Sequence, residues 1–281
     1  MSYPRIIARL DIKGPNLVKG IHLEGLRVLG SPYEFAKKYV EDGADELFYQ
    51  DVVASLYGRN SILDFIKKTA KIISIPLTVG GGIRKINDIN DVLKAGADKV
   101  AINTAAIKNP SIIKEASRIF GSSTIVASIE TIKNKEGEYL AYTDNGREHT
   151  GINIFEWSKQ LEELGVGEIV ITSIDQEGTG NGFDVTLLKK IRSIVSIPVI
   201  AHGGFGNYNH IIKAITEGGA NGVALSSMIH YGALFNNEFI NNEIAEGNRS
   251  FVSNLRQYKS FGAMDIRKIK NDLKDQVNIR I

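Results

Sequence analysis

An apolar run ends in paired glycines at Ile197-Pro198-Val199-Ile200-Ala201-His202-Gly203-Gly204-Phe205-Gly206. A second copy of this pattern stands earlier in the chain, at Ile75-Pro76-Leu77-Thr78-Val79-Gly80-Gly81-Gly82-Ile83-Arg84. Each copy is followed by a helical stretch, a Gly-Ala step and another apolar strand. That strand ends in Asn103-Thr104 in the first copy and in Ser226-Ser227 in the second. The chain therefore contains an internal duplication, whose unit is strand, glycine turn, helix and strand.

Short β-branched runs alternate with amphipathic stretches along the whole chain. Strands are predicted at Arg5–Asp11, Glu46–Asp51, Ile75–Val79, Lys99–Asn103, Thr124–Glu130, Glu168–Ser173, Ile197–Ala201 and Gly222–Ser226. Helices are predicted near the C-terminus and at about Pro32–Glu41, Ser61–Ile73, Ile86–Lys94, Pro110–Phe120, Ile154–Glu163, Val185–Ser193 and Asn209–Thr216. This alternation predicts a closed, parallel α/β barrel. No Pro/Ser-rich linker divides the chain, so we expect one domain over residues 1–281.

The composition excludes several classes of protein. A net charge of +2 gives no sign of nucleic acid or of an anionic membrane as partner. The chain has no cysteine, which excludes disulfides, thiolate catalysis and cysteine-bound metals. Its five histidines lack metal-ligand spacing, so we expect no metal and no other cofactor. Arg5 and Arg9 interrupt the apolar N-terminal run, which is therefore no secretory signal, and we expect a cytoplasmic protein.

The glycine turns predict two phosphate-binding sites, one in each half of the chain. Glycine lets the backbone approach an anion closely and point N–H groups at it. Tight turns alone would explain one copy equally well, but not two copies with matched polar ends. Two sites suit a ligand with a phosphate at each end. The candidate residues are Gly81, Gly82, Asn103 and Thr104 in the first half, and Asp175, Gly178, Thr179, Gly203, Gly204, Ser226 and Ser227 in the second.

Two carboxylates stand at equivalent strand ends of the two halves. Asp11 ends the first predicted strand and Glu130 ends the fifth, so both are expected at the C-terminal mouth of the barrel, on opposite walls. Two carboxylates that face one ligand can act as general acid and general base. A solvated carboxylate at a strand end is the plainer interpretation, but the duplication and the flanking phosphate sites favour catalysis.

Long loops follow both of these strands, at Ile12–Ser31 and Thr131–Gly151. Barrels of this kind keep their chemistry in the loops at the C-terminal ends of the strands. The second loop is predicted to turn a hairpin at Lys133–Glu138. The first is rich in glycine, and a lysine in a mobile, glycine-flanked loop can close over an anionic ligand, so Lys19 is a candidate contact. On spacing alone a plain surface lysine is the plainer interpretation, and the sequence leaves open whether this loop is ordered without ligand.

Four charged residues open strands at the opposite end of the barrel: Arg5, Glu46, Lys99 and Glu168. Because side chains alternate along a strand, all four are expected to point into the barrel. They could also be surface residues at strand starts. Two cations and two anions predict a charge-balanced ring, which is a costly way to gain stability. The ring therefore predicts a gate for a small molecule that enters from below.

These features resemble the HisF family, the cyclase subunit of imidazole glycerol phosphate synthase, over nearly the whole chain. The resemblance implies a (β/α)8 TIM barrel with a twofold internal half-barrel repeat. The motifs that carry it occur in the family's order: Leu10-Asp11-Ile12-Lys13, Val18-Lys19-Gly20, Thr78-Val79-Gly80-Gly81-Gly82-Ile83-Arg84, Ile102-Asn103-Thr104-Ala105-Ala106, Thr172-Ser173-Ile174-Asp175 and Gly178-Thr179.

The resemblance also implies a mechanism of the lyase and cyclase type, in histidine biosynthesis. A HisH-like glutaminase would dock at the N-terminal face as a heterodimer, and its ammonia would pass the four-residue gate and rise through the barrel. At the mouth the ammonia would attack the bisphosphate substrate PRFAR, giving imidazole glycerol phosphate and AICAR. Asp11 falls on the family's first catalytic aspartate and Lys19 on its loop lysine.

The mouth departs from the family's pattern. Glu130 replaces the second catalytic aspartate, and a misplacement of about 1 Å can cost on the order of a hundredfold in rate. Arg9 replaces a small residue and is expected to point inward beneath Asp11, where a cation favours the ionised carboxylate. Glu177 replaces an aspartate of the phosphate loop, and His202 replaces a serine before the second glycine pair.

The chain has the four charged residues of the family's gate but departs from the family's pattern at the mouth. In this it is similar to HisF-like paralogues found with surface-polysaccharide genes, the WbuZ type. With a HisH-like glutaminase and a separate sugar amidotransferase, these are thought to convert an acetamido group of a nucleotide-linked sugar into an acetamidino group. The stretch Ser55-Leu56-Tyr57-Gly58-Arg59-Asn60 also favours this branch.

Three alternatives stay open: a true histidine-pathway cyclase, a non-catalytic ammonia conduit that activates its glutaminase, and, less well supported, a single-chain sugar-phosphate isomerase. The isomerase would have no use for the charged ring. The sequence leaves open the acceptor, the oligomeric state and the affinity for a partner. It also leaves open whether Arg9 blocks the ammonia path and whether Glu130 supports catalysis.

Overall fold

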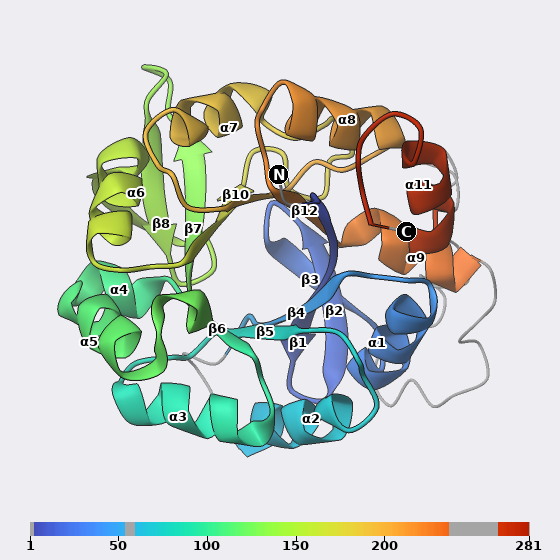
Figure 1. Cartoon of the computed structure of the whole chain (residues 1–281), viewed down its shortest axis with the longest axis horizontal. Coiled ribbons are helices and arrows are strands. Elements are labelled where there is room, and N and C mark those ends of the chain that lie inside the picture. The colour runs from blue at the N-terminus through green and yellow to red at the C-terminus, as the bar shows by residue number, and fades with distance from the viewer. Residues whose placement is uncertain (1–2, 54–59, 236–263, 281) are drawn as a thin grey trace.

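The computed structural model describes residues 3–53, 60–235 and 264–280, and Figure 1 shows helices arranged around a central barrel. Parallel pairing runs through the barrel strands, and β10 pairs with β7 to close it. The predicted (β/α)8 barrel is confirmed. Residues Ser55 to Arg59, which favour the polysaccharide branch, lie outside the described residues. In barrel order the strands are β1 (Arg5–Lys13), β4 (Glu46–Asp51), β5 (Leu77–Gly80), β6 (Lys99–Ile102), β7 (Ile125–Lys133), β10 (Glu168–Ser173), β11 (Val199–His202) and β12 (Gly222–Leu225).

Helices cover the outside of the barrel, and some of them begin where a side chain accepts a hydrogen bond from a first-turn N–H group. Asp184, for example, accepts a hydrogen bond from Leu187 N at 2.9 Å at the start of one of them. No helix in the described part of the chain is long and apolar enough to cross a membrane. The helices are α1 (Pro32–Glu41), α2 (Asn60–Ala70), α3 (Ile86–Ala95), α4 (Thr104–Lys108), α5 (Ser111–Phe120), α6 (Ile154–Glu163), α7 (Val185–Arg192), α8 (Tyr208–Thr216), α9 (Ser227–Phe235) and α11 (Ile266–Leu273), with a 3-10 turn at Ser122–Thr124.

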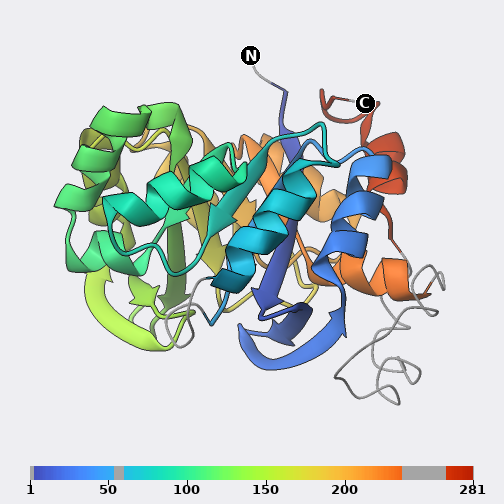
Figure 2. The same ribbon diagram turned by 90° about the horizontal axis from the view of Figure 1, so that it is seen from below.

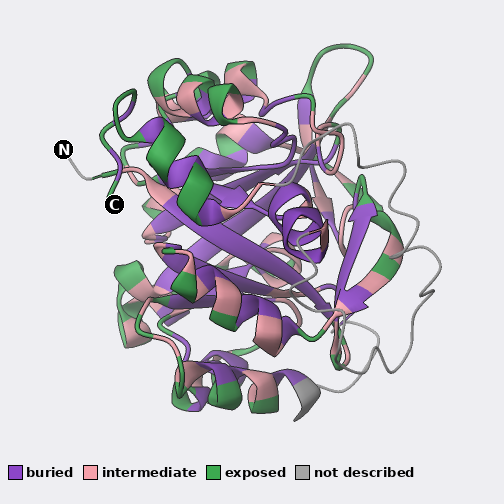
Figure 3. Cartoon of the chain, turned by 90° about the vertical axis from the view of Figure 1, so that its right-hand side faces the viewer, coloured by how far each residue is buried: buried purple, intermediate pink, exposed green. Residues whose placement is uncertain are grey.

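The alternation of side chains along each strand divides the core into two shells. In β1, Ile6 and Ala8 belong to the large cluster between strands and helices, whereas Ile7 belongs to a cluster inside the barrel. The strands are accordingly buried on both faces (Figure 3). We call the inner cluster the inner apolar layer; it consists of Ile7, Phe48, Ala101, Val126, Val170, Ile200 and Ala224.

The duplication appears in the structure as two equivalent hairpins. One, formed by β2 (Asn16–Ile21) and β3 (Glu24–Gly30), extends β1, and the other, formed by β8 (Tyr139–Thr143) and β9 (Glu148–Asn153), extends β7. Figure 2 shows both at the same end of the barrel, opposite the N-terminus. The hairpin predicted at Lys133–Glu138 is confirmed, because Asn134 N donates to Glu138 O at 2.8 Å.

Most of the first long loop is the hairpin of β2 and β3, so Lys19 lies within a strand. Its turn is made by His22 and Leu23, with φ of 54° and 62°. Two-residue hairpin turns in which both residues have positive φ usually contain Asn-Gly or Asp-Gly. With His and Leu in those positions, the sequence carries no hairpin signal.

Candidate functional site

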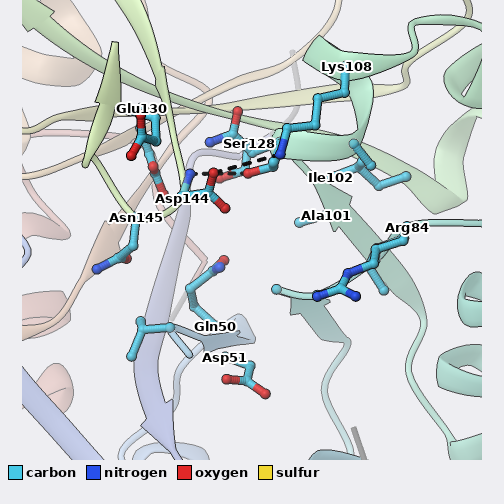
Figure 4. Close-up of a pocket in the computed structure, with 18 of the residues that line it drawn as sticks. Gln50, Asp51, Arg84, Ala101, Ile102, Lys108, Ser128, Glu130, Asp144 and Asn145 are labelled. Carbon is cyan, nitrogen blue, oxygen red and sulfur yellow. Dashed lines mark hydrogen bonds and ion pairs between the residues drawn. The ribbon is translucent and has the colours of Figure 1, made fainter. Parts of the chain in front are cut away.

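A cavity of about 660 Å³ opens at the C-terminal end of the barrel, over β4, β5, β6 and β7. Figure 4 shows Gln50, Ala101, Ser128 and Glu130 around one space, with Arg84 and Lys108 beside it. Its lining includes five of the predicted site residues, namely Gly81, Gly82, Asn103, Thr104 and Glu130. The structure therefore brings the phosphate candidates of the first half together with one of the two candidate catalytic carboxylates.

The glycine turn of the first half fits the backbone role expected of it. Gly81 has a φ of 97°, and a Cβ there would overlap the carbonyl group of Asp51. Asn103, however, donates its Nδ2 to Tyr142 O at 3.1 Å, while its buried Oδ1 lacks a hydrogen-bond partner. The side-chain donor of Asn103 is therefore already used within the protein.

Three basic residues line the same cavity and were missed at the sequence level: Arg84, Lys108 and Arg147. All three are exposed. Arg84 directly follows the glycine turn and was within reach of the sequence argument. Lys108 and Arg147 come from α4 and from the β8–β9 turn, where no periodic pattern points to the mouth. Together they supply the positive charge that an anionic ligand needs.

Asp11 belongs to a buried cluster of four charges, which we call the mouth quartet: Arg9, Asp11, Lys19 and Glu177. Arg9 Nε lies 3.0 Å and Lys19 Nζ 2.8 Å from the Asp11 carboxylate, and Lys19 also pairs with Glu177. Each member is at most 1% exposed. Lys19 is thus fixed in β2. The prediction that Arg9 points inward beneath Asp11 is confirmed.

The pKa values of the two candidate catalytic carboxylates are shifted in opposite directions. Burial acts to raise the pKa of Asp11, but the charges of Lys19 and Arg9 outweigh it and hold that pKa well below its usual range. Burial raises the pKa of Glu130 to about 7, although Arg9 and a hydrogen bond from Gly146 N at 2.8 Å oppose the shift. At neutral pH, Asp11 is therefore ionised, while Glu130 can hold or release a proton.

The second-half candidates do not line the cavity. A Cβ on Gly178 would lie 2.9 Å from Gly20 O, so the loop carrying Gly178 packs directly under the β2–β3 hairpin. Ser226 donates to Arg9 O at 3.2 Å, and Thr179 donates to Gln176 O at 2.7 Å. The remaining polar candidates are Asp175, which is exposed and accepts a hydrogen bond from Lys133 N at 2.8 Å, and Ser227, which begins α9.

The four charges at the opposite end form the predicted ring. Arg5 Nη1 lies 2.6 Å from Glu46, and Arg5 also pairs with Glu168. Lys99 Nζ completes the ring at 2.9 Å from Glu46 and 3.4 Å from Glu168. Each cation therefore bridges the same two carboxylates, and the geometry of the ring is confirmed. We call these residues the entrance ring.

Comparison with known proteins adds a family to this geometry. A family model described as "Histidine biosynthesis protein" matches residues 5–234. The protein named "Imidazole glycerol phosphate synthase subunit HisF" of Legionella pneumophila is 58% identical over 206 residues, which cover 73% of this chain and 97% of the relative.

The protein of the same name from Prochlorococcus marinus strain AS9601 is 46% identical over 228 residues, which cover 80% of this chain and 89% of the relative. Both matches cover most of this chain and most of the relative. The chain belongs to the HisF family of histidine biosynthesis proteins.

Proposed function

We propose that this chain is the synthase subunit of a glutamine amidotransferase, which takes ammonia from a HisH-like glutaminase and delivers it through the barrel to a phosphate-bearing acceptor at the mouth. The entrance ring carries this proposal. Its four charges meet at the N-terminal end of the barrel, where desolvation offsets much of what their ion pairs contribute to stability. A ring that can open and close explains their position better than a structural role does.

Exposed apolar side chains on the N-terminal face support a docked partner. Tyr3, Ile72, Ile119 and Ile194 are 55%, 41%, 49% and 38% exposed. Each lies just before a barrel strand or at the C-terminal end of a helix, and so on the face that carries the entrance ring. Clusters of exposed apolar residues around a functional opening are typical of protein interfaces.

The altered mouth supports an acceptor other than PRFAR. Asp11 is held ionised between Arg9 and Lys19, which makes it a poor proton donor. We therefore propose that the chain serves amidation of a nucleotide-linked sugar of a surface polysaccharide, together with a separate sugar amidotransferase. The first-half cavity, with its glycine turn and basic residues, would hold a phosphate of that acceptor.

A second candidate is a true cyclase acting on PRFAR in histidine biosynthesis, in keeping with the names of the relatives. One observation favours it specifically. Glu130 has a pKa raised to about 7 by burial, which suits a general acid or base near neutral pH. On this alternative the longer side chain is tolerated, and Glu130 carries the proton transfers.

The decisive experiment measures PRFAR consumption by the purified chain, with ammonium chloride at alkaline pH and with a HisH-like glutaminase and glutamine at neutral pH. Glutaminase stimulation without PRFAR turnover is the result we expect, and it points to another acceptor. Robust turnover would establish the cyclase. Lys99→Ala should abolish coupling between the subunits, whereas Lys71→Ala, which removes an exposed lysine of the same face, should not. Unchanged coupling in Lys99→Ala would show that the ring is no gate.

A further inference from the structure

Above the inner apolar layer, one side of the barrel interior is filled. Arg9 reaches from β1 across to β10 and β11, where its Nη1 lies 3.2 Å from Thr172 Oγ1 and 3.1 Å from His202 Nδ1. The guanidinium carbon also lies 5.4 Å from the centre of the Phe48 ring. Because a guanidinium can only donate, His202 Nδ1 is an acceptor, and the ring is neutral. Burial and the charges of Arg9 and Lys19 keep its pKa well below the usual value.

The wall of β5, β6 and β7 carries small inward side chains instead. A Cβ on Gly80 would lie 2.5 Å from Gln50 Oε1 and 3.2 Å from both Ala101 Cβ and the Phe48 ring, so only a residue without a side chain fits there. Ala101 belongs to the inner apolar layer and also lines the cavity, as do Ser128 and Glu130 (Figure 4). The cavity therefore descends on this wall as far as the apolar layer.

Lys99 of the entrance ring lies directly beneath this point, on the same strand. It precedes Ala101 by two residues, a rise of about 7 Å along β6. On this wall, a molecule that has passed the ring has the single layer of Ala101 and Val126 between it and the cavity. On the opposite wall it would have to pass Val170 and then Arg9.

We propose that ammonia rises along the wall of β5, β6 and β7 and emerges beside Ser128 and Glu130, while Arg9 closes the wall of β10 to β12 and keeps ammonia from Asp11. The identity of the travelling molecule rests on the function proposed above; the route itself is a property of the barrel. Glu130 is then the carboxylate that meets ammonia. Its raised pKa of about 7 lets it exchange a proton with ammonia near neutral pH.

Cysteine accessibility tests the route, because the chain has no cysteine of its own. Ala101→Cys and Ala224→Cys place a thiol in the same apolar layer on opposite walls, at positions that are 2% and 1% exposed. Each variant is treated with methyl methanethiosulfonate, and the disulfide formed is followed by mass spectrometry. We expect Ala101→Cys to react at least tenfold faster. Equal rates, or faster labelling of Ala224→Cys, would overturn the route.

A second pair covers the case in which an alanine variant fails to fold. Ser128→Cys and Ser226→Cys are nearly isosteric and replace residues that are 5% and 6% exposed, one on each wall. Ser226 donates to the backbone carbonyl of Arg9, so its position is fixed on the wall that Arg9 fills. Faster labelling of Ser128→Cys would support the route, and the reverse order would refute it.

These labelling rates separate the route from the proposed function. They need neither the glutaminase nor an acceptor, so loss of subunit coupling leaves a rate difference between the walls intact. Equal rates remove the route even where coupling and Lys99 dependence are found. Melting curves of each variant show that the labelled protein is folded, since an unfolded chain exposes every thiol.

Discussion

Arg9 sets the roles of the two carboxylates at the mouth. It binds Asp11 at 3.0 Å, and together with Lys19 it fixes the negative charge there. Glu130 lies buried on β7, where no cation of the described residues forms an ion pair with it, and burial raises its pKa to about 7, so that it can hold or release a proton near neutral pH. Carboxylates whose environments drive their pKa values apart take different parts in acid–base chemistry. We infer that Asp11 serves as a fixed charge and Glu130 as the proton carrier.

The raised pKa of Glu130 predicts a pH-dependent loss of stability. Below pH 4.5 both folded and unfolded chains hold the proton; above it the unfolded chain ionises while folded Glu130 stays neutral up to a pKa of about 7. The stability contributed by Glu130 is thus full below pH 4.5 and lost as the pH rises through 7, a change of about 3 kcal/mol. Glu130→Gln should remove this pH dependence. In urea unfolding, the stability of the variant relative to the wild type should therefore increase as the pH rises from 4.5 through 7.

Two buried histidines also make the stability depend on pH between about 3 and 7. The measurement must therefore be the difference in the free energy of unfolding between the wild type and the Glu130→Gln variant. The pKa values of His202 and His230 are lowered by burial, to about 3 for His230, so their contribution to stability rises with pH. Both histidines are present in wild type and variant. Glu136→Gln, at an exposed position, should follow the wild type to within about 0.5 kcal/mol. A pH-independent difference for Glu130→Gln would contradict the raised pKa.

Single residues were predictable from sequence where strand alternation places them. The four entrance-ring residues and the position of Arg9 beneath Asp11 follow from a period of two along strands that are easily recognised. Gln50 and Ser128 could have been found by the same rule. Asn145 and Arg147 could not, because they reach the cavity from a turn whose position depends on contacts between distant segments.

Among the helices and strands, the β2–β3 hairpin is the element that the sequence did not predict. It is held over the mouth by contacts with the loop after β10: Leu23 N donates to Glu177 at 3.0 Å, and His22 Nδ1 lies 2.7 Å from Ile174 O. These partners are more than 150 residues apart, so no local pattern records them. The eight barrel strands, in contrast, were located to within a few residues because each is a local apolar run between helices.

Lys19 joins this hairpin to the barrel, and its removal should be costly. Lys19→Met would leave Glu177 buried without its cation, which typically destabilises by about 3–5 kcal/mol. The double variant Lys19→Met/Glu177→Gln should recover part of this loss, because the unpaired charge is gone. Urea denaturation measures both.

Lys108→Met provides the matched control, since its ion pair with Asp144 is long and the lysine side chain is 69% exposed. It should change the free energy of unfolding by at most about 0.5 kcal/mol. If Lys19→Met were equally mild, the buried pairing of the hairpin would contribute nothing to stability.

The second glycine turn should tolerate no side chain. Gly204 has a φ of 103°, and a Cβ there would overlap the carbonyl group of Gly182, whose N–H donates to Gly204 O at 2.7 Å. Gly204→Ala should therefore destabilise by more than about 3 kcal/mol, since strain and a backbone clash add. Gly14→Ala, at a φ of 58° with no atom within 4 Å, should cost about 1 kcal/mol. Equal melting temperatures for the two variants would contradict this account.

In the whole molecule, the barrel interior carries one balanced set of charges at each end. The entrance ring lies below the inner apolar layer and the mouth quartet above it, and each consists of two cations and two anions. The overall barrel and the entrance ring were predictable because they follow from repeated local patterns. The mouth quartet was foreseen in part, but the positions of Lys19 and Glu177 depend on the hairpin fold.

The N-terminal face should bind the glutaminase through its exposed apolar residues. Ile119→Asp places a charge at a 49% exposed position at the end of α5, on the face of the entrance ring. We expect it to weaken binding of a HisH-like glutaminase at least tenfold in a calorimetric titration, because apolar contacts at interfaces contribute through desolvation.

Tyr208→Asp is the control for this measurement. Tyr208 is 38% exposed and begins α8, at the opposite end of the barrel. The substitution should leave the dissociation constant unchanged. Equal losses for the two variants would place the partner elsewhere.

The mouth quartet also constrains how such a protein can evolve. Its two positive and two negative charges are almost completely shielded from water, so replacing any one residue with a neutral one leaves a net charge in a dry interior. Neutral substitutions within the mouth quartet should therefore be epistatic, because the loss of one cation is accommodated better when a neighbouring anion is neutralised with it. The free-energy cost of neutralising one cation and one anion together should be smaller than the sum of the two single costs.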